Sequence, residues 1–187
     1  MEDQKIVELF FSRSERAISE TDSKYGRYCK YISQNILCNR EDAEECVNDA
    51  YLGAWRAIPP HAPQNLKAFL GKLTRNLAIK ALEKKQAEKR GGGQAELALA
   101  ELDECISSNS SVEDLLDEAL LTAAINAFLA TLPAINRQIF VRRYWYVSSI
   151  SDIVEQYDMS ESKVKSMLFR LRKQLKAHLE KEGFLYE

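Results

Sequence analysis

The feature that most limits the fold of this chain is the spacing of its apolar residues, which recurs every three or four positions in almost every segment. No stretch alternates convincingly at the two-residue period of a half-buried strand. The pattern breaks at Gly91–Gly93, and the acidic stretch that follows contains the run SSNSS. The sequence therefore predicts an all-α protein, with one helical domain at residues 1–90, a flexible acidic linker at residues 91–112 and a second helical domain at residues 113–187.

Charge is segregated along the chain, although its formal net value is only −2. Residues 65–90 carry eight cations and two anions, residues 94–120 carry eight anions and no cation, and residues 161–181 carry seven cations and two anions. A wholly basic protein that coats nucleic acid is excluded, so any electrostatic binding depends on these local regions. The sequence has no apolar core fit for a signal peptide and no apolar run long enough to span a bilayer, so we expect a cytoplasmic protein without membrane insertion.

Motifs of catalysis and metal binding are missing from the sequence. The two histidines, His61 and His178, fall in different predicted domains, and neither has a cysteine or carboxylate at the spacing of a metal site. The three glycines are not followed by the Lys-Ser/Thr pair of a phosphate-binding loop. The cysteines form no C-x-x-C pair, and Cys29 and Cys46 fall on apolar helix faces. We therefore expect no enzyme, no cofactor and no metal.

The clearest helix of the first domain is predicted in the run NREDAEECVNDAYLGAWRAI. Asn39 suits the N-cap, acidic residues fill the first turn, and apolar residues repeat at three- and four-residue steps as far as Ile58. The segment PPHAP then ends the helix, because proline cannot continue it. Further helices of this domain are expected at about residues 6–18 (with an interruption), 23–37 and from 65 onward.

Two helices joined by a tight turn are predicted in the run SSISDIVEQYDMSESKVKSMLFRLRKQL. Ser149 suits the first N-cap, Asp158 tolerates the left-handed backbone of such a turn, and Ser160 suits the second N-cap. A helix–turn–helix of this kind can place its second helix in the major groove of DNA. A helical hairpin with a solvated basic face fits the same periodicity.

On the helix–turn–helix geometry, the first turns of the second helix meet base edges and its later cations meet phosphates. The candidates for the base-reading end, including the capping serine, are Ser160, Glu161, Ser162, Lys163, Lys165 and Ser166. The candidates for phosphate contacts are Arg170, Arg172, Lys173 and Lys176.

The order of these parts resembles the extracytoplasmic-function group of bacterial RNA polymerase sigma factors. The resemblance rests on EDAEECVNDAYLGAWRAI, a proline loop, NLKAFLGKLTRNLAIKAL, an acidic linker and the run from LPAINRQIFVRRYWYV to RKQL. It covers nearly the whole chain and implies a promoter-specificity subunit. The first domain would dock on polymerase and open the downstream promoter element, and the second would read the upstream element. A stand-alone helix–turn–helix regulator and a polymerase-binding adaptor without promoter reading are the alternatives.

The resemblance also implies a polymerase-docking face on the helix that matches Asp42–Trp55. The implied partners are the clamp helices of the largest polymerase subunit, the flap and an anti-sigma protein. The implied contact residues are Asp42, Glu45, Asn48, Asp49, Trp55 and Arg56. Their mostly acidic character suits a basic partner surface, and an ordinary acid-capped surface helix is the alternative.

A downstream promoter contact is implied from the loop at His61 onward. Family members capture an unstacked base there by stacking and polar edge contacts, and the matching residues are His61, Asn65, Lys67 and Phe69. The matching contacts to the duplex backbone are Lys72, Arg75, Asn76, Lys80 and Lys84. Phe69 also fits the core face, so both of its roles stay open.

Two further expectations concern charge. Family members often end this helix in dense arginines, whereas this chain has KALEKKQAEKR. Lysine binds a phosphate as a point charge rather than as a planar fork, so we expect weaker or less oriented duplex binding. The resemblance implies that the acidic linker occupies the basic channel that later holds nascent RNA, and a solvated tether fits its composition equally.

Overall fold

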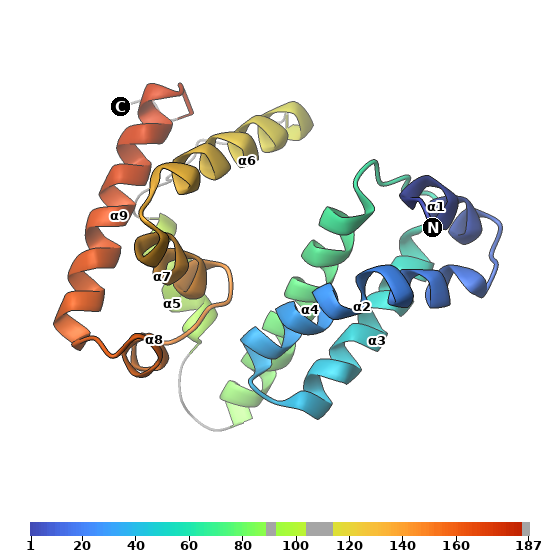
Figure 1. Ribbon diagram of the computed structural model, residues 1–187, viewed down its shortest axis with the longest axis horizontal. Helices are drawn as coiled ribbons and strands as arrows, with labels where there is room; N and C mark the ends of the chain where they lie inside the picture. The colour runs from blue at the N-terminus through green and yellow to red at the C-terminus, as the bar shows by residue number, and fades with distance from the viewer. Residues whose placement is uncertain (89–92, 104–113, 185–187) are drawn as a thin grey trace. The chain divides into compact units, whose positions relative to one another are not determined.

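The computed structural model describes residues 1–88, 93–103 and 114–184. All regular structure in these ranges is α-helical, which confirms the predicted fold class. The chain divides into two compact units, Met1–Gly93 and Gln94–Glu187 (Figure 1). The first unit contains α1 (Asp3–Phe11), α2 (Arg16–Leu37), α3 (Arg40–Ala57) and α4 (Leu66–Glu88). The second unit contains α5 (Gln94–Asp103), α6 (Asp114–Thr131), α7 (Ala134–Tyr144), α8 (Ile150–Tyr157) and α9 (Glu161–Lys181).

In the first unit, α2, α3 and α4 pack against one another as a bundle, and α1 packs on α2 (Figure 1). The predicted interruption near the N-terminus is present, because Arg13 has a left-handed φ of 54° between α1 and α2. Helix α2 begins at Arg16 rather than at the predicted Ser23. Ala17 and Thr21 are buried and extend its inner face by more than a turn.

Local chemistry sets both ends of α3. At its start, the side chain of Asn39 accepts a hydrogen bond of 3.0 Å from the backbone N–H of Asp42, which confirms the predicted N-cap. At its end, Ile58 adopts an extended backbone with φ −110° and ψ 115°. A residue before proline is driven out of the helical conformation, so Pro59 fixes the last turn of the helix.

The core of the first unit uses the residues that periodicity places inside. On α3 and just after it, the side chains that are at most 5% exposed are Ala43, Cys46, Val47, Ala50, Tyr51, Ala54 and Ile58. Burial raises the pKa of the Cys29 thiol and raises that of Cys46 to about 11. Because a thiol must ionise to react, these two cysteines are packing residues, as predicted.

In the second unit, α9 packs against α6, α7 and α8. Phe128 of α6 and Phe140 of α7 meet edge to face with their ring centroids 6.1 Å apart. Ile139 of α7 and Ile153 of α8 are fully buried in the core of this unit. The inner leucines of α9 complete this core, so the orientation of α9 is fixed by packing along its length.

The predicted flexible linker differs from the structure over residues 94–103, which form α5 and belong to the second unit. Residues 91–92 and 104–112 of that predicted linker lie outside the described residues. Ala95 and Ala98 of α5 are each 1% exposed, and Glu101 forms an ion pair with Arg143 of α7. This acidic segment can pack because Arg143, 42 positions away in the sequence, neutralises Glu101. The local composition of the segment does not reveal such a distant partner.

Candidate nucleic-acid and partner interfaces

The turn between α8 and α9 is built by local capping. Ser149 and Asp152 form a reciprocal capping box at the start of α8. Asp158 ends α8 with a left-handed backbone, φ 48° and ψ 52°. Ser160 then caps α9, because its Oγ accepts a hydrogen bond of 3.3 Å from the backbone N–H of Lys163. These positions match the predicted helix–turn–helix residue by residue.

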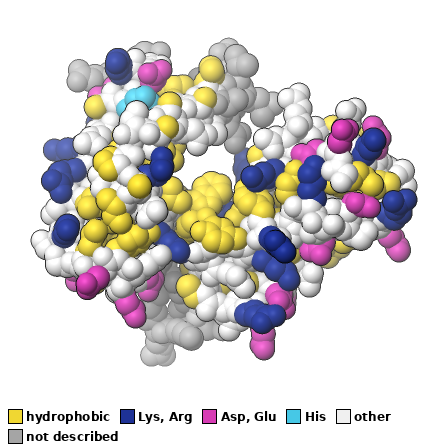
Figure 2. Space-filling view, in the orientation of Figure 1, with side chains coloured by type: hydrophobic (Ala, Val, Ile, Leu, Met, Phe, Trp, Pro, Cys, Tyr) yellow, Lys and Arg dark blue, Asp and Glu magenta, His cyan; other side chains and the backbone are white. Residues whose placement is uncertain are grey.

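One face of α9 is buried and the opposite face is open to solvent. The buried side chains are Val164, Leu168, Leu171, Leu175 and Leu179. The exposed candidates for DNA contact are Ser160, Glu161, Ser162, Lys163, Lys165, Ser166, Arg170 and Lys173. Figure 2 shows Lys and Arg side chains spaced along the outer edge of this helix. The geometry that a major-groove reader needs is therefore present on α9.

The charged pair at the start of α9 is weakly held. The Nζ of Lys165 lies 2.5 Å from Oε1 of Glu161, and both side chains are more than 60% exposed. The hydrogen bond and the charge of Lys165 lower the pKa of Glu161. Solvent screens an exposed pair of this kind, so Lys165 can exchange its carboxylate partner for another acceptor.

Sequence reasoning missed Phe169, which is 51% exposed on the outer face of α9. The Nζ of Lys173 lies 4.8 Å from the centroid of its ring. Phe169 stands three residues after Ser166 and four after Lys165, off the buried leucine stripe. That spacing could have identified it as an apolar side chain on the same exposed face as Lys165 and Ser166.

Arg172 differs from the other predicted phosphate contacts, because its side chain is only 13% exposed. Its Nη1 donates to the hydroxyl of Tyr144 at 2.8 Å and to Oε2 of Glu101 at 3.3 Å. In this conformation Arg172 faces α5 and α7, unlike the exposed Arg170 and Lys173.

The start of α4 presents the candidate downstream site. Asn65 caps α4 by accepting a 2.9 Å hydrogen bond from the backbone N–H of Ala68, and the Nζ of Lys67 lies 5.1 Å from the centroid of the Tyr28 ring. Phe69 is half-buried and packs against the core, which favours the core interpretation of this residue. The exposed candidates are His61, Asn65, Lys67, Lys72, Asn76, Lys80 and Lys84.

Arg75 is the exception among the cations of α4. It is half-buried, and burial lowers the pKa of its guanidinium. An arginine remains charged at neutral pH after such a shift. Its position differs from that of Lys72 and Lys80, which are exposed on the same helix.

The six predicted docking residues on α3 fall into two groups, four that are exposed and two that make contacts within the first unit. Glu45, Asn48, Asp49 and Arg56 are exposed there. The two other candidates are engaged within the unit. Asp42 forms an ion pair with Lys85 of α4. The ring of Trp55 packs edge to face on Phe10, with centroids 6.2 Å apart, and the guanidinium of Arg13 lies 5.4 Å from the Trp55 centroid.

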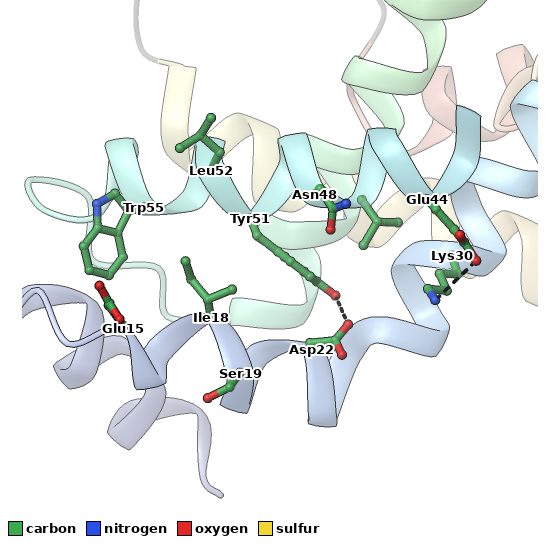
Figure 3. A pocket seen from close by; sticks show the side chains of 11 residues that line it. Glu15, Ile18, Ser19, Asp22, Lys30, Glu44, Asn48, Tyr51, Leu52 and Trp55 are labelled. Carbon is green, nitrogen blue, oxygen red and sulfur yellow. Dashed lines mark hydrogen bonds and ion pairs between the residues drawn. The ribbon is translucent and has the colours of Figure 1, made fainter. Parts of the chain in front are cut away.

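A groove of about 840 Å³ runs between α2 and α3 beside this face (Figure 3). Leu52 of α3 is 43% exposed and lines the groove together with Asn48 and Trp55. Tyr51 donates a hydrogen bond of 2.9 Å to Oδ1 of Asp22 across the groove, and burial and this bond raise the pKa of Tyr51. The predicted acidic face therefore borders an apolar strip that includes Leu52, which sequence reasoning missed.

Two negative findings apply to the part of the chain that the structure describes. No cluster of three or more His, Cys, Asp or Glu side chains that could hold a metal ion is found among these residues. None of the helices traced there has both the length and the apolar character needed to cross a membrane.

Two family models match separate parts of this chain. The family model Sigma-70 region 2 matches residues 23–88, and the model Sigma-70, region 4 matches residues 122–175. A solved structure described as "Structure of CnrH in complex with the cytosolic domain of CnrY" is similar over 96% of this chain and 98% of that chain, with 16% sequence identity and a TM-score of 0.43. No curated protein matches the sequence.

The two matched regions occur in the order that the sequence resemblance implies. Region 2 falls in the bundle of α2, α3 and α4, and region 4 contains the helix–turn–helix of α8 and α9. Residues 89–121 separate the two matches. The chain therefore belongs to the sigma-70 family.

Proposed function

We propose that this sigma factor binds core RNA polymerase and directs promoter-specific initiation of transcription in the cytoplasm. The observation that carries the proposal is the presence of both sigma-70 regions in one chain, each with exposed charged side chains on a helix surface. The proposed partners are the clamp helices and flap of polymerase, promoter DNA and an anti-sigma protein. The role is binding and positioning, so the protein is a regulatory subunit and not an enzyme.

The second unit reads the upstream element with the outer face of α9. Ser162, Lys165, Ser166 and Phe169 follow one another at steps of three, one and three residues, which places them on one side of the helix. Lys165 reaches acceptors on base edges, and the exposed ring of Phe169 suits the methyl group of thymine. Lys173 and Arg170 stand further along the helix and bind phosphates, which fixes the register of the unit on the duplex.

The first unit acts at the downstream element through α4 and the loop before it. Because Phe69 packs against the core, His61 and the amide of Asn65 are the better candidates for contact with an unstacked base. Lys72, Lys80 and the other exposed cations of α4 bind the backbone of the adjoining duplex.

Polymerase binds the acidic outer face of α3. Glu45 and Asp49 are one turn apart and exposed, so they present two negative charges to a basic partner surface. Asp42 and Trp55 act within the unit, where they hold α3 against α4 and α1. Leu52, in the groove beside this face, adds an apolar contact area.

Reconstitution with core polymerase, followed by mapping of transcription starts, tests the proposal. We expect the full chain to bind core polymerase and to yield transcripts from a defined set of promoters that share two sequence elements. Sequence-specific DNA binding without any polymerase association would instead support a stand-alone regulator. Polymerase binding without promoter-dependent transcripts would support an adaptor.

A further inference from the structure

Helix α5 lies against α7 through one narrow face (Figure 1). Ala95 and Ala98 are buried in this contact, and Leu102 contributes to an apolar cavity of about 490 Å³ in the same unit. On its other side, Leu97 and Leu99 are 53% and 48% exposed. Two alanines remove little apolar surface from water, so hydrophobic burial alone holds α5 weakly.

Glu101 makes the polar part of the contact. Its Oε1 accepts from Nη2 of Arg143 at 2.6 Å and its Oε2 accepts from Nε of the same guanidinium at 3.2 Å. Oε2 also accepts from the hydroxyl of Tyr144 at 3.0 Å and from Nη1 of Arg172 at 3.3 Å. One carboxylate thus binds Arg143 of α7 through two charge-assisted hydrogen bonds and Arg172 of the recognition helix through one.

Arg143 depends on this carboxylate, because its side chain is 2% exposed. Its other hydrogen bonds go to neutral acceptors, Oε1 of Gln94 at 3.2 Å and the backbone carbonyl of Ser148 at 2.9 Å. A buried cation whose anion is removed either rehydrates or destabilises its surroundings. Water can reach Arg143 if α5 moves away, so loss of the Glu101 charge favours undocking of α5.

We propose that Glu101 latches α5 onto the second unit in the free protein, and that release of the latch lengthens the connection between the two units. With α5 docked, the connection is residues 89–93, which can span no more than about 18 Å. With α5 released, it is residues 89–113, which can span about 90 Å when fully extended. A ten-residue helix is marginal on its own in water, so release also favours melting of α5.

The use of this latch rests on the proposed function, because two units that read separate promoter elements must be able to separate along the DNA. Release also removes one hydrogen-bonded carboxylate from Arg172 of the recognition helix. The existence of the latch is a property of the free chain and can be tested without polymerase or DNA.

Hydrogen exchange on the full chain in solution tests the latch, with E101Q as the perturbed variant and E96Q as its matched control. Glu96 lies on the same helix and is exposed, so E96Q removes the same charge without the contact. We expect the amides of residues 98–103 to exchange at least tenfold faster in E101Q than in wild type or E96Q. Amides of the buried stretch of α9, residues 168–175, are expected to keep their protection in all three proteins.

Unchanged exchange of α5 in E101Q would refute the latch. Equal acceleration in α5 and α9 would also refute it, because Glu101 would then stabilise the whole unit rather than a separable helix. Small-angle X-ray scattering tests the lengthening. The radius of gyration should rise in E101Q and stay at the wild-type value in E96Q, and an equal radius in all three proteins would refute the longer connection. If either latch prediction fails, the proposal of polymerase binding still stands. If the chain does not bind polymerase, the latch can still be present in the free protein.

Discussion

Replacing Lys165 by glutamine is expected to change which upstream promoter elements are used while leaving the fold intact. Lys165 stands four residues after Glu161 at the start of α9, about 6 Å along the helix axis. The major groove is about 12 Å wide, so the first two turns of a docked helix lie within it. The side chain is 62% exposed and its pair with Glu161 is screened by solvent, so the substitution removes the proposed DNA contact and leaves the packing of α9 unchanged.

The size of the effect follows from the chemistry of base contacts. A good side-chain contact to a base edge discriminates between bases by about 1–3 kcal/mol, which corresponds to about a 5- to 140-fold change in relative promoter use. Reconstituted wild-type and K165Q holoenzymes would transcribe a promoter pool whose upstream element is randomised. Sequencing of the transcripts then ranks the elements that each protein uses.

Lys176 supplies the control on the same helix. It lies about 22 Å from the helix start, is 50% exposed and stands 3.8 Å from Glu180, so K176Q removes an equal charge away from the base-reading turns. We expect K176Q to weaken all promoters alike and to reduce the salt dependence of binding by a slope of about 0.9. If K165Q ranks the elements as wild type does, or if K176Q reorders them equally, the assignment of the reading turns is refuted.

Three further predictions concern the partner face, a cap and the latch. The double variant Glu45→Lys, Asp49→Lys should abolish polymerase association in a pull-down without shifting the melting temperature. The control variant Glu8→Lys, a charge reversal at an exposed position of α1, should bind polymerase normally. Unfolding of the double variant would show that the face is structural. Ser149→Ala should lower the unfolding free energy by about 1 kcal/mol in urea titrations, and an unchanged midpoint would contradict the capping box. The pKa of Glu101 is lowered, because Arg143 outweighs the opposing effect of burial. Its contribution is therefore complete above the ordinary value of 4.5 and is lost as the pH falls below it, so the difference in α5 amide protection between wild type and E101Q should shrink from pH 6 to pH 3.

The parts of the fold that sequence predicts well are those set by neighbours along the chain. A cap such as Asn39 or Ser160 satisfies a backbone N–H three residues away, and the left-handed Asp158 is selected by its own backbone preferences. The buried face of α3 follows from its helical period for the same reason. These features appear in the structure at the predicted residues.

The parts that sequence did not predict depend on contacts between distant segments. Three of the ten residues of α5 are acidic, and this composition predicts a solvated tether. The fold changes that interpretation, because it brings Arg143 beside Glu101. The sequence predicts Arg172 to be one more exposed cation of α9. In the structure its side chain follows the buried Leu171 and donates a hydrogen bond to Tyr144. The sequence likewise predicts Asp42 to be part of an exposed acidic face. In the structure Asp42 forms an ion pair with Lys85, which lies 43 residues later.

Two kinds of charged pair in the second unit differ in burial and in the sequence distance between the partners. The pairs at i, i+4 on α9, Glu161 with Lys165 and Lys176 with Glu180, have both side chains at least 41% exposed. Solvent screens them, and another acceptor can replace either anion at little cost. Arg143 is 2% exposed and meets its partner across 42 positions, so its charge cannot be transferred to a ligand unless a helix moves. Simple DNA binding should therefore exchange the partners of Lys165 and Lys176 without rearrangement. Arg172 instead shares Glu101 with Arg143, so within the described residues this carboxylate couples α5 to the recognition helix.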